Sequence, residues 1–212
     1  MQNIENIILD YGNVLFDIDF SKLRQSFIDL GVLEVDKFYG HRAQHPLFDA
    51  FDKGLLTADQ FRNEIRNATG NSELTNDAID AAWNSLLIGV RPGHHELLRK
   101  LNGQYRTFLL SNNNEIHYHW IISHLNQNFG LQDNSSFFEK DYYSHLLHMR
   151  KPDPEIFEFV LNTHSLNPER TLFVDDSPQH IDTALRLGLH AHLLAPGDSL
   201  PSLLERFGLI KQ

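Results

Sequence analysis

The chain has 212 residues, with 28 acidic against 18 basic side chains for a formal net charge of −10, and it contains no cysteine. Without cysteine, disulfides, thiolate nucleophiles, zinc–thiolate clusters and cysteine-ligated iron–sulfur centres are excluded, so any metal must be held by oxygen or imidazole ligands. With 41% apolar residues, a chain of this length is expected to form one globular domain with a modest insertion.

The charge balance and the apolar runs also limit the partners. An acidic excess argues against a general binder of nucleic acid or anionic membranes, because most of the surface would offer neither partner a counter-charge. No run approaches 18 apolar residues, and the N-terminus lacks a basic stretch followed by a long apolar core. We therefore expect a cytoplasmic protein that acts on a small molecule, and the sequence leaves its oligomeric state open.

In chain order, the first element is a buried strand over Ile4 to Leu9, a short apolar run. Every pattern in the following residues 16–90 is helical, and Thr57 with Gln60 has the form of a capping box for a helix that stops at Gly70. We therefore predict an α-helical cap over residues 16–90. The last of its apolar stripes comprises Ile79, Trp83, Leu86 and Leu87.

Strands and helices alternate in the rest of the chain. Further buried strands are predicted over Tyr105 to Leu110, Thr171 to Val174 and Ala191 to Leu194. Helices are predicted to open at Pro92, at Pro154 and at Ser177 with Pro178. Another helix is predicted over residues 115–125, with His117 and His119 on its surface and not as metal ligands. The alternation predicts an α/β fold, a doubly wound parallel sheet formed by residues 1–15 and 91–212.

Polar side chains stand where the predicted strands end. Asp10 follows the first strand, Ser111 the second, and Asp175 with Asp176 the third, while Lys151 precedes a proline-rich helix start. Each has an ordinary alternative as a turn residue, a helix cap or a solvated lysine. Together they are more informative, because ligands of open parallel sheets bind beyond the carboxyl ends of the strands.

Three carboxylates at one edge of a sheet would repel one another and raise one another's pKa, so they require a bound cation or a nearby lysine. Oxygen ligands without cysteine favour Mg²⁺. A hard cation, a lysine, a serine hydroxyl and the free amides of a helix start together neutralise a phosphoryl group. The residues thus indicate phosphoryl chemistry in which an aspartate could attack phosphorus.

The sequence resembles the haloacid dehalogenase superfamily of hydrolases, whose four signature blocks appear in order. They are Asp10-Tyr11-Gly12-Asn13-Val14, Leu110-Ser111-Asn112, Arg150-Lys151-Pro152-Asp153-Pro154 and Phe173-Val174-Asp175-Asp176-Ser177. The spacing leaves room for a cap in the first gap only. The resemblance implies a Rossmann-like core with an α-helical cap inserted after the first strand.

The resemblance also implies a role for each block. Asp10 and Lys151 would be the catalytic residues, with Asp10 as the nucleophile that forms an aspartyl-phosphate. The phosphate would be held by Ser111, the amide of Asn112 and Lys151. Mg²⁺ would be bound by Asp10, the carbonyl of Gly12 and Asp176, with Asp175 reaching it through water.

One position departs from the pattern. Most phosphatases of the superfamily carry a second aspartate two positions after the nucleophile as general acid and base, whereas this chain has Gly12. The Asp-x-Gly-Asn-Val form resembles the bacterial branch that contains α-D-glucose-1-phosphate phosphatase, and an anomeric oxygen needs less protonation on leaving than an ordinary alcohol does. Water for the second step would be activated by Asp17, Asp19, His180 or a substrate hydroxyl.

Three functions remain open at this point. The leading one is a Mg²⁺-dependent phosphatase for a small phosphorylated metabolite such as a sugar phosphate. A 2-haloacid dehalogenase would attack carbon without a metal, but such enzymes generally have tyrosine at the position of Gly12 and lack the pair Asp175-Asp176. A catalytically idle phosphate-binding protein would explain the missing acid and base.

Overall fold

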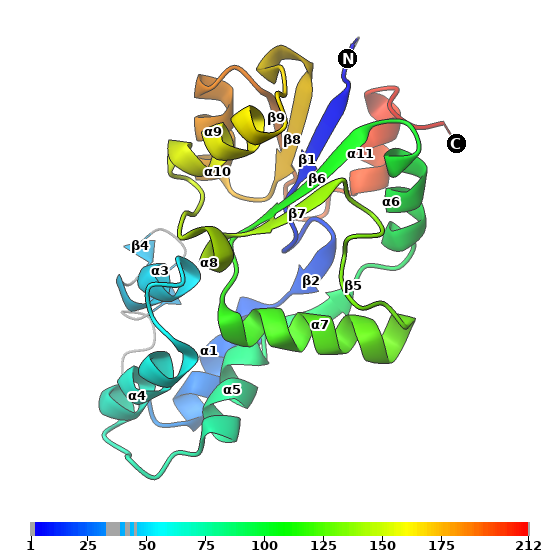
Figure 1. The fold of residues 1–212 in the computed structure, drawn as a ribbon. Coiled ribbons are helices and arrows are strands. Elements are labelled where there is room, and N and C mark those ends of the chain that lie inside the picture. The colour runs from blue at the N-terminus through cyan, green and yellow to red at the C-terminus, as the bar shows by residue number, and fades with distance from the viewer. Residues whose placement is uncertain (1–2, 33–38, 41–42, 45, 212) are drawn as a thin grey trace.

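A five-stranded parallel sheet is the centre of the fold. The computed structural model describes residues 3–32, 39–40, 43–44 and 46–211. The strand order is β7-β6-β1-β8-β9, and every neighbouring pair is parallel (Figure 1). The strands are β1 (Asn6–Leu9), β6 (Arg106–Ser111), β7 (Lys140–Tyr143), β8 (Thr171–Asp175) and β9 (His190–Leu193). The predicted doubly wound α/β fold is confirmed, and β7 is a strand that the sequence patterns did not predict.

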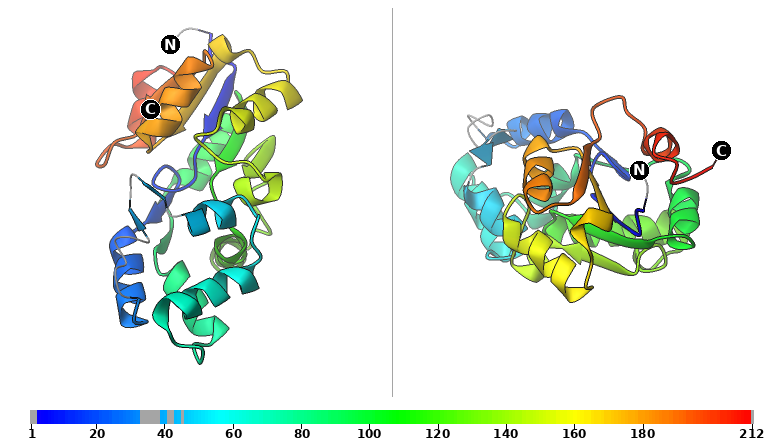
Figure 2. Two further views of the ribbon diagram at one scale, coloured as in Figure 1. Left: turned by 90° about the vertical axis from the view of Figure 1, so that its left-hand side faces the viewer. Right: turned by 90° about the horizontal axis from the view of Figure 1, so that it is seen from above.

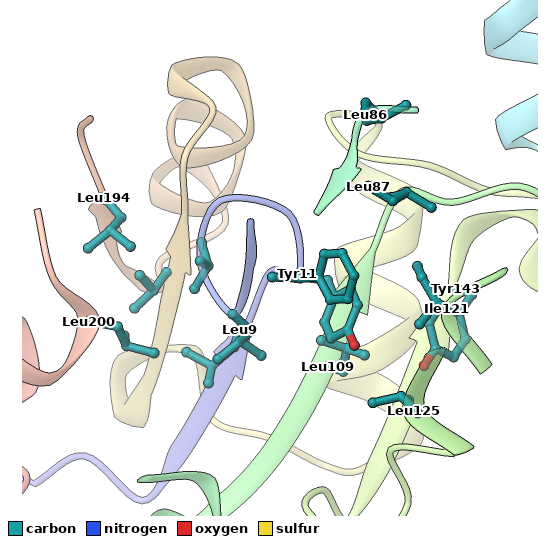
Figure 3. Close-up of a cluster of buried hydrophobic side chains, with 14 of the residues drawn as sticks. Leu9, Tyr11, Leu86, Leu87, Leu109, Ile121, Leu125, Tyr143, Leu194 and Leu200 are labelled. Carbon is teal, nitrogen blue, oxygen red and sulfur yellow. The ribbon is translucent and has the colours of Figure 1, made fainter. Parts of the chain in front are cut away.

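Helices cover both faces of the sheet because its strands are apolar on both sides. Leu9 packs into the core cluster on one face and Ile8 into the cluster on the other, as the twofold period of a strand requires. The Leu9 face carries α6 (His94–Asn102), α7 (Glu115–Phe129) and α11 (Leu200–Arg206), and the Ile8 face carries α9 (Pro154–Thr163) and α10 (Pro178–Arg186). Figure 2 shows these layers from two further directions, and Figure 3 shows side chains of the Leu9 cluster.

The helices begin close to their predicted positions. Pro154 and Pro178 open α9 and α10, whereas α6 begins at His94 because Gly93 caps it with a positive φ of 77°. A short α8 (Ser144–Leu147) and a 3₁₀ turn (Pro168–Arg170) complete this part of the chain. In the part of the chain that the structure describes, no helix is both long and apolar enough to cross a membrane.

We call residues 16–90 the helical insertion. It contains α1 (Phe20–Asp29), α3 (Pro46–Asp52), α4 (Ala58–Thr69) and α5 (Asn76–Asn84), with short strands β3 (Tyr39–Gly40) and β4 (Ala43–Gln44). The capping box of α4 is present: Gln60 N donates to Thr57 Oγ1 at 3.2 Å, and Thr57 N donates to Gln60 Oε1 at 2.9 Å. An aromatic cluster forms the interior of the insertion and includes Phe48, Phe51, Phe61 and Trp83.

The expectation that every pattern in residues 16–90 is helical is wrong at both ends. Strand β2 (Phe16–Ile18) pairs antiparallel with β5 (Leu87–Val90), and α5 ends before Leu87, which was predicted to lie on a helical stripe. The pairing joins two ends of the insertion that are far apart in the sequence, so no local periodicity reveals it. This two-stranded ribbon connects the insertion to the sheet, and the ion pair between Arg91 Nε and Asp17 Oδ1 at 2.6 Å spans it.

Candidate active site

Three adjacent strands end at one edge of the sheet. Leu9 of β1 lies opposite Leu109 of β6 on one side and Val174 of β8 on the other, so the residues that follow these three positions lie side by side. Asp10 continues this arrangement, because its N–H donates to the carbonyl of Val174 at 2.9 Å. Ser111 is the buried last residue of β6. The predicted convergence of polar groups from separate strands is therefore present.

Lys151 lies at the centre of this edge and is completely buried. Its Nζ donates to Asp10 Oδ1 at 2.7 Å and to Asp175 Oδ2 at 2.6 Å, and it stands 5.5 Å from the centre of the Phe173 ring. A buried ammonium is tolerated only when such partners replace its water. Lys151 thus links two of the three carboxylates that the strand ends deliver.

The side chain of Asn112 fixes the backbone of Lys151. Its Nδ2 donates to the Lys151 carbonyl at 2.8 Å, and the Lys151 N–H donates to its Oδ1 at 2.9 Å. The amide therefore acts as a two-point clamp between the end of β6 and the loop before α9. Sequence reasoning assigned Asn112 to phosphate alone and missed this contact, because the two residues are 39 positions apart.

Asp10, Asp175 and Asp176 each offer a carboxylate oxygen, and these oxygens lie within 4.8 Å of one another. Asp176 Oδ2 also accepts from Asn13 Nδ2 at 2.8 Å. Asn13 has a φ of 55°, a conformation that asparagine adopts more readily than most residues. The turn after β1 thereby brings an amide donor to the second carboxylate of the Asp175-Asp176 pair.

Burial and mutual charge set the protonation of this cluster. Burial, with a further contribution from Asp175 and Asp176, raises the pKa of Asp10 to about 8 despite the Lys151 ammonium. Burial also opposes ionisation of Asp175, but Lys151 and His180 outweigh it and hold the pKa of Asp175 below its ordinary value. Burial lowers the pKa of Lys151, yet the two carboxylates together raise it above the ordinary value.

The donor set fits a hard divalent cation. Three carboxylates face a single ammonium, so their charges are not balanced within the cluster, and burial raises the pKa of Asp176 as well. A divalent cation would restore the balance and lower the pKa of Asp10 to the range of an ionised nucleophile. The oxygen-only chemistry is that of a Mg²⁺ site.

Gly12 stands at the position of the missing acid, and a side chain there would be in tight contact with the insertion. A Cβ at Gly12 would stand 3.1 Å from Cδ1 of Ile18, a residue of β2 in the helical insertion.

Two of the side chains predicted as candidates for activating water have partners elsewhere. Asp17 pairs with Arg91, and Asp19 caps α1 by accepting from Ser21 N at 2.9 Å. The third predicted candidate, His180, lines the cleft described below, and its Nδ1 lies 2.8 Å from Asp175 Oδ1.

A cleft of about 1000 Å³ opens between this edge and the helical insertion. Asp10, Gly12 and Asp176 lie at its base, and Ile18, Phe20, Trp83 and Leu86 contribute apolar surface from the insertion. Its volume lies in the range of small-molecule sites. The predicted nucleophile thus faces a space that both parts of the chain enclose.

A hydrogen-bonded cluster at the start of α7 closes the far side of the cleft, and sequence reasoning missed it. Asn114 Oδ1 accepts from Trp83 Nε1 at 3.1 Å, and its Nδ2 donates to Asp52 Oδ1 and to His117 Nδ1, each at 3.1 Å. His117 Nε2 donates to the Trp83 carbonyl at 3.0 Å. His117 is thus partly buried by these hydrogen bonds and lines the cleft, so the surface position expected for it is only partly correct, whereas His119 is exposed as predicted.

The strand ends of the parallel sheet bring three aspartates and a buried lysine together beneath the helical insertion. This combination is typical of hydrolases of the haloacid dehalogenase type. Residues 4–188 match the family model of the haloacid dehalogenase-like hydrolases. The chain belongs to this family.

Relatives with named activities or bound ligands match nearly the whole chain. The chain is 34% identical over 185 residues to D-ribitol-5-phosphate phosphatase of Bacteroides thetaiotaomicron, across 87% of this chain and 89% of that protein. A family enzyme of the same organism, solved with magnesium and inorganic phosphate, is 32% identical with a TM-score of 0.83, over 94% of this chain and 98% of that one. A family hydrolase from Porphyromonas gingivalis is 28% identical with a TM-score of 0.88, over 99% and 100%.

Proposed function

We propose that this hydrolase cleaves the phosphate monoester of a small sugar or sugar alcohol through an aspartyl-phosphate on Asp10. The enzyme is a phosphoric monoester hydrolase with Mg²⁺ as its cofactor. The observation that carries the proposal is the position of Lys151, which holds Asp10 and Asp175 together at the base of the cleft. The named activity of the ribitol phosphate relative supports the substrate class.

In this proposal each residue of the edge has a separate task. Lys151 holds Asp10 Oδ1, so Oδ2 is the oxygen assigned to attack phosphorus. Ser111, Lys151 and the backbone amide of Asn112 bind the phosphate, because the Asn112 side chain is occupied in the clamp. Asp10, Asp176 and the Gly12 carbonyl would hold Mg²⁺, with Asp175 acting through water, and the ion would neutralise phosphate charge.

The reaction has two halves. Asp10 Oδ2 forms a bond to phosphorus, the bond from phosphorus to the sugar oxygen breaks, and that oxygen leaves with the electron pair and takes up a proton. Water then cleaves the aspartyl-phosphate to inorganic phosphate and restores Asp10. Because Gly12 supplies no acid, the proton must reach the leaving oxygen from a substrate hydroxyl, from water or from another side chain of the cleft.

We also propose that residues 1–15 and 91–212 form the catalytic core and that residues 16–90 act as a cap. The cleft has walls from both parts, and the β2–β5 ribbon is the double connection between them. A cap of this kind would exclude water from the site and select the leaving group.

Phosphate release from a panel of esters with Mg²⁺ tests the function. The panel includes ribitol 5-phosphate, a primary ester, and α-D-glucose 1-phosphate, an anomeric one. We expect release that EDTA abolishes and added Mg²⁺ restores, and we expect an acid quench to leave a phosphoryl group on the peptide that contains Asp10. Undiminished turnover in EDTA contradicts the proposal, and chloride release from 2-chloropropionate would favour the dehalogenase instead. Binding of Mg²⁺ and beryllium fluoride without turnover of any ester would favour the idle binding protein.

A further inference from the structure

We propose that Asp49, Asp52 and Arg150 form a charge filter that admits neutral polyhydroxylated leaving groups and rejects leaving groups with a second negative charge. All three line the cleft, and we call them the acidic rim. This inference rests on the proposed phosphatase function and adds to it the residues that select the substrate. The contacts of α3, the charges of the rim and the chemistry of hydroxyl groups carry the argument.

Helix α3 is part of the insertion, but its end is fixed to the core. The carbonyl of Asp52 accepts from Ser144 Oγ at 2.6 Å, and the carbonyl of Lys53 is 3.0 Å from His148 Nδ1. Lys53 Nζ also pairs with Asp153 Oδ2 at 2.8 Å. Figure 1 shows α3 beside α8 at this junction. The carboxylates of α3 are therefore held in place at the opening of the cleft.

The rim carries more negative than positive charge. The Arg150 guanidinium pairs with Asp49, and its Nη2 lies 3.9 Å from Asp52 Oδ2. Among the described residues that line the cleft, Arg150 has the one side chain with a guanidinium or ammonium group. Burial lowers the pKa of His117 to about 4, so this neighbour adds no positive charge near neutral pH. Lys53 Nζ also lies 3.7 Å from Asp49 Oδ2 while it pairs with Asp153 Oδ2 at 2.8 Å. Asp49, Asp52 and Asp153 therefore face the two cations Arg150 and Lys53, and these five described side chains carry a net charge of −1.

The exposure of the rim shows how a substrate meets it. The side chain of Arg150 is 11% exposed and that of Asp52 is 13% exposed, whereas that of Asp49 is 39% exposed. Asp49 is therefore the charged side chain of the rim most open to a substrate, whereas Asp52 and Arg150 are about equally buried. Carboxylates accept strong hydrogen bonds from hydroxyl groups, and they repel another anion most strongly where water is partly excluded.

Together these features select the leaving group. A phosphate bound near Asp10 extends its sugar or polyol chain across the cleft toward α3, where each hydroxyl can donate to a rim carboxylate. A carboxylate or second phosphate at the far end of the substrate would meet like charge, and Arg150 is already paired. Discrimination of this kind comes from a repulsive element as much as from an attractive one.

Matched pairs of esters measure the filter. One pair is ribitol 5-phosphate with 5-phosphoribonate, and the other is α-D-glucose 1-phosphate with α-D-glucuronate 1-phosphate. The members of a pair differ in the replacement of a terminal CH₂OH by a carboxylate. In whichever pair the wild type hydrolyses faster, we expect kcat/KM to favour the neutral ester by about 100-fold.

Variants test whether the rim causes that preference. Asp49→Asn with Asp52→Asn keeps the shape of both side chains and removes their charges, so we expect the preference to fall at least about tenfold, mainly through KM. Arg150→Gln removes the guanidinium and leaves Lys53 as the cation beside Asp49, so the rim becomes more negative and we expect the preference to rise. The control Glu64→Gln with Asp77→Asn removes two charges from exposed positions on α4 and α5, and its preference should equal that of the wild type.

The outcomes separate this inference from the proposed function. If the wild type releases phosphate but treats both esters of a pair alike, the filter is wrong and the phosphatase stands. If the Asp49/Asp52 variant keeps the wild-type preference, or the control loses it equally, the rim is not its cause. Should the double variant fail to fold, a drop of the preference in Arg150→Gln overturns the filter and a rise supports it. Absence of phosphate release from every ester refutes the proposed function itself.

Discussion

The edge of the sheet and the far side of the cleft are built in different ways. At the edge, Asp10 and Asp175 follow neighbouring strands, and one buried lysine connects them. On the far side, Asn114 connects Trp83 and Asp52, which come from separate helices of the insertion. The edge is therefore positioned by the ends of neighbouring strands, whereas the far side is formed by contacts between the insertion and the start of α7. Chemistry should depend on the first region and substrate selection on the second.

The largest effect is expected from Asp10→Asn. This substitution removes the nucleophile of the proposed reaction while Lys151 keeps its bond to Asp175, so we expect phosphate release to fall by about 10⁴-fold or more with little change in thermal stability. Steady-state phosphate release and a thermal melt measure the two effects. Activity within about tenfold of the wild type would show that another group attacks phosphorus.

Lys151→Met should cost both activity and stability. It leaves Asp10 and Asp175 buried next to each other without their shared ammonium, and removal of one partner from a buried ion pair costs about 3–5 kcal/mol. Urea unfolding measures this loss, and Mg²⁺ should recover part of it because a cation again balances the carboxylates. Lys100→Met, at an exposed position of α6, is the matched control. Equal stability of the two variants would mean that the lysine does not hold the edge together.

The same contrast explains what could be predicted from the sequence. Strand ends place Asp10, Ser111 and Asp175, and the sheet rule that brings such ends together is independent of distance along the chain. The capping box at Thr57 is likewise readable because its contacts are local. Contacts between side chains of separate segments, such as Asn112 with the Lys151 backbone, leave no periodic signal. The β2–β5 ribbon was missed because its backbone pairing likewise joins segments that are far apart in the sequence.

Acid should weaken the far side of the cleft through His117. The ring is neutral in the fold, since Nδ1 accepts from Asn114 and Nε2 donates to the Trp83 carbonyl. Burial lowers its pKa to about 4 from an ordinary value of 6.5, so between these values the unfolded chain binds more protons. Stability from this group is therefore present above pH 6.5 and falls as the pH drops toward 4, by up to about 3 kcal/mol.

His117→Gln isolates that contribution. Urea unfolding from pH 7 to pH 4 should show a smaller loss of stability in this variant than in the wild type. His119→Gln, an exposed position on the same helix, should follow the wild-type curve. Identical pH profiles for the wild type and His117→Gln would mean that folding does not lower the pKa of His117, which would contradict this prediction.

The smallest effect is expected from Trp83→Phe, a substitution on the far side of the cleft. Phenylalanine keeps a ring for the stack on His117, whose centre is 4.7 Å away, but loses the donor to Asn114 Oδ1. That oxygen still accepts from His117 N at 3.1 Å, so the stability cost should be only about 1 kcal/mol. Because Asn114 also bonds to Asp52 in the acidic rim, the variant should raise KM for a sugar phosphate and leave kcat nearly unchanged. A fall in kcat with constant KM would show instead that the far side helps to position the catalytic edge.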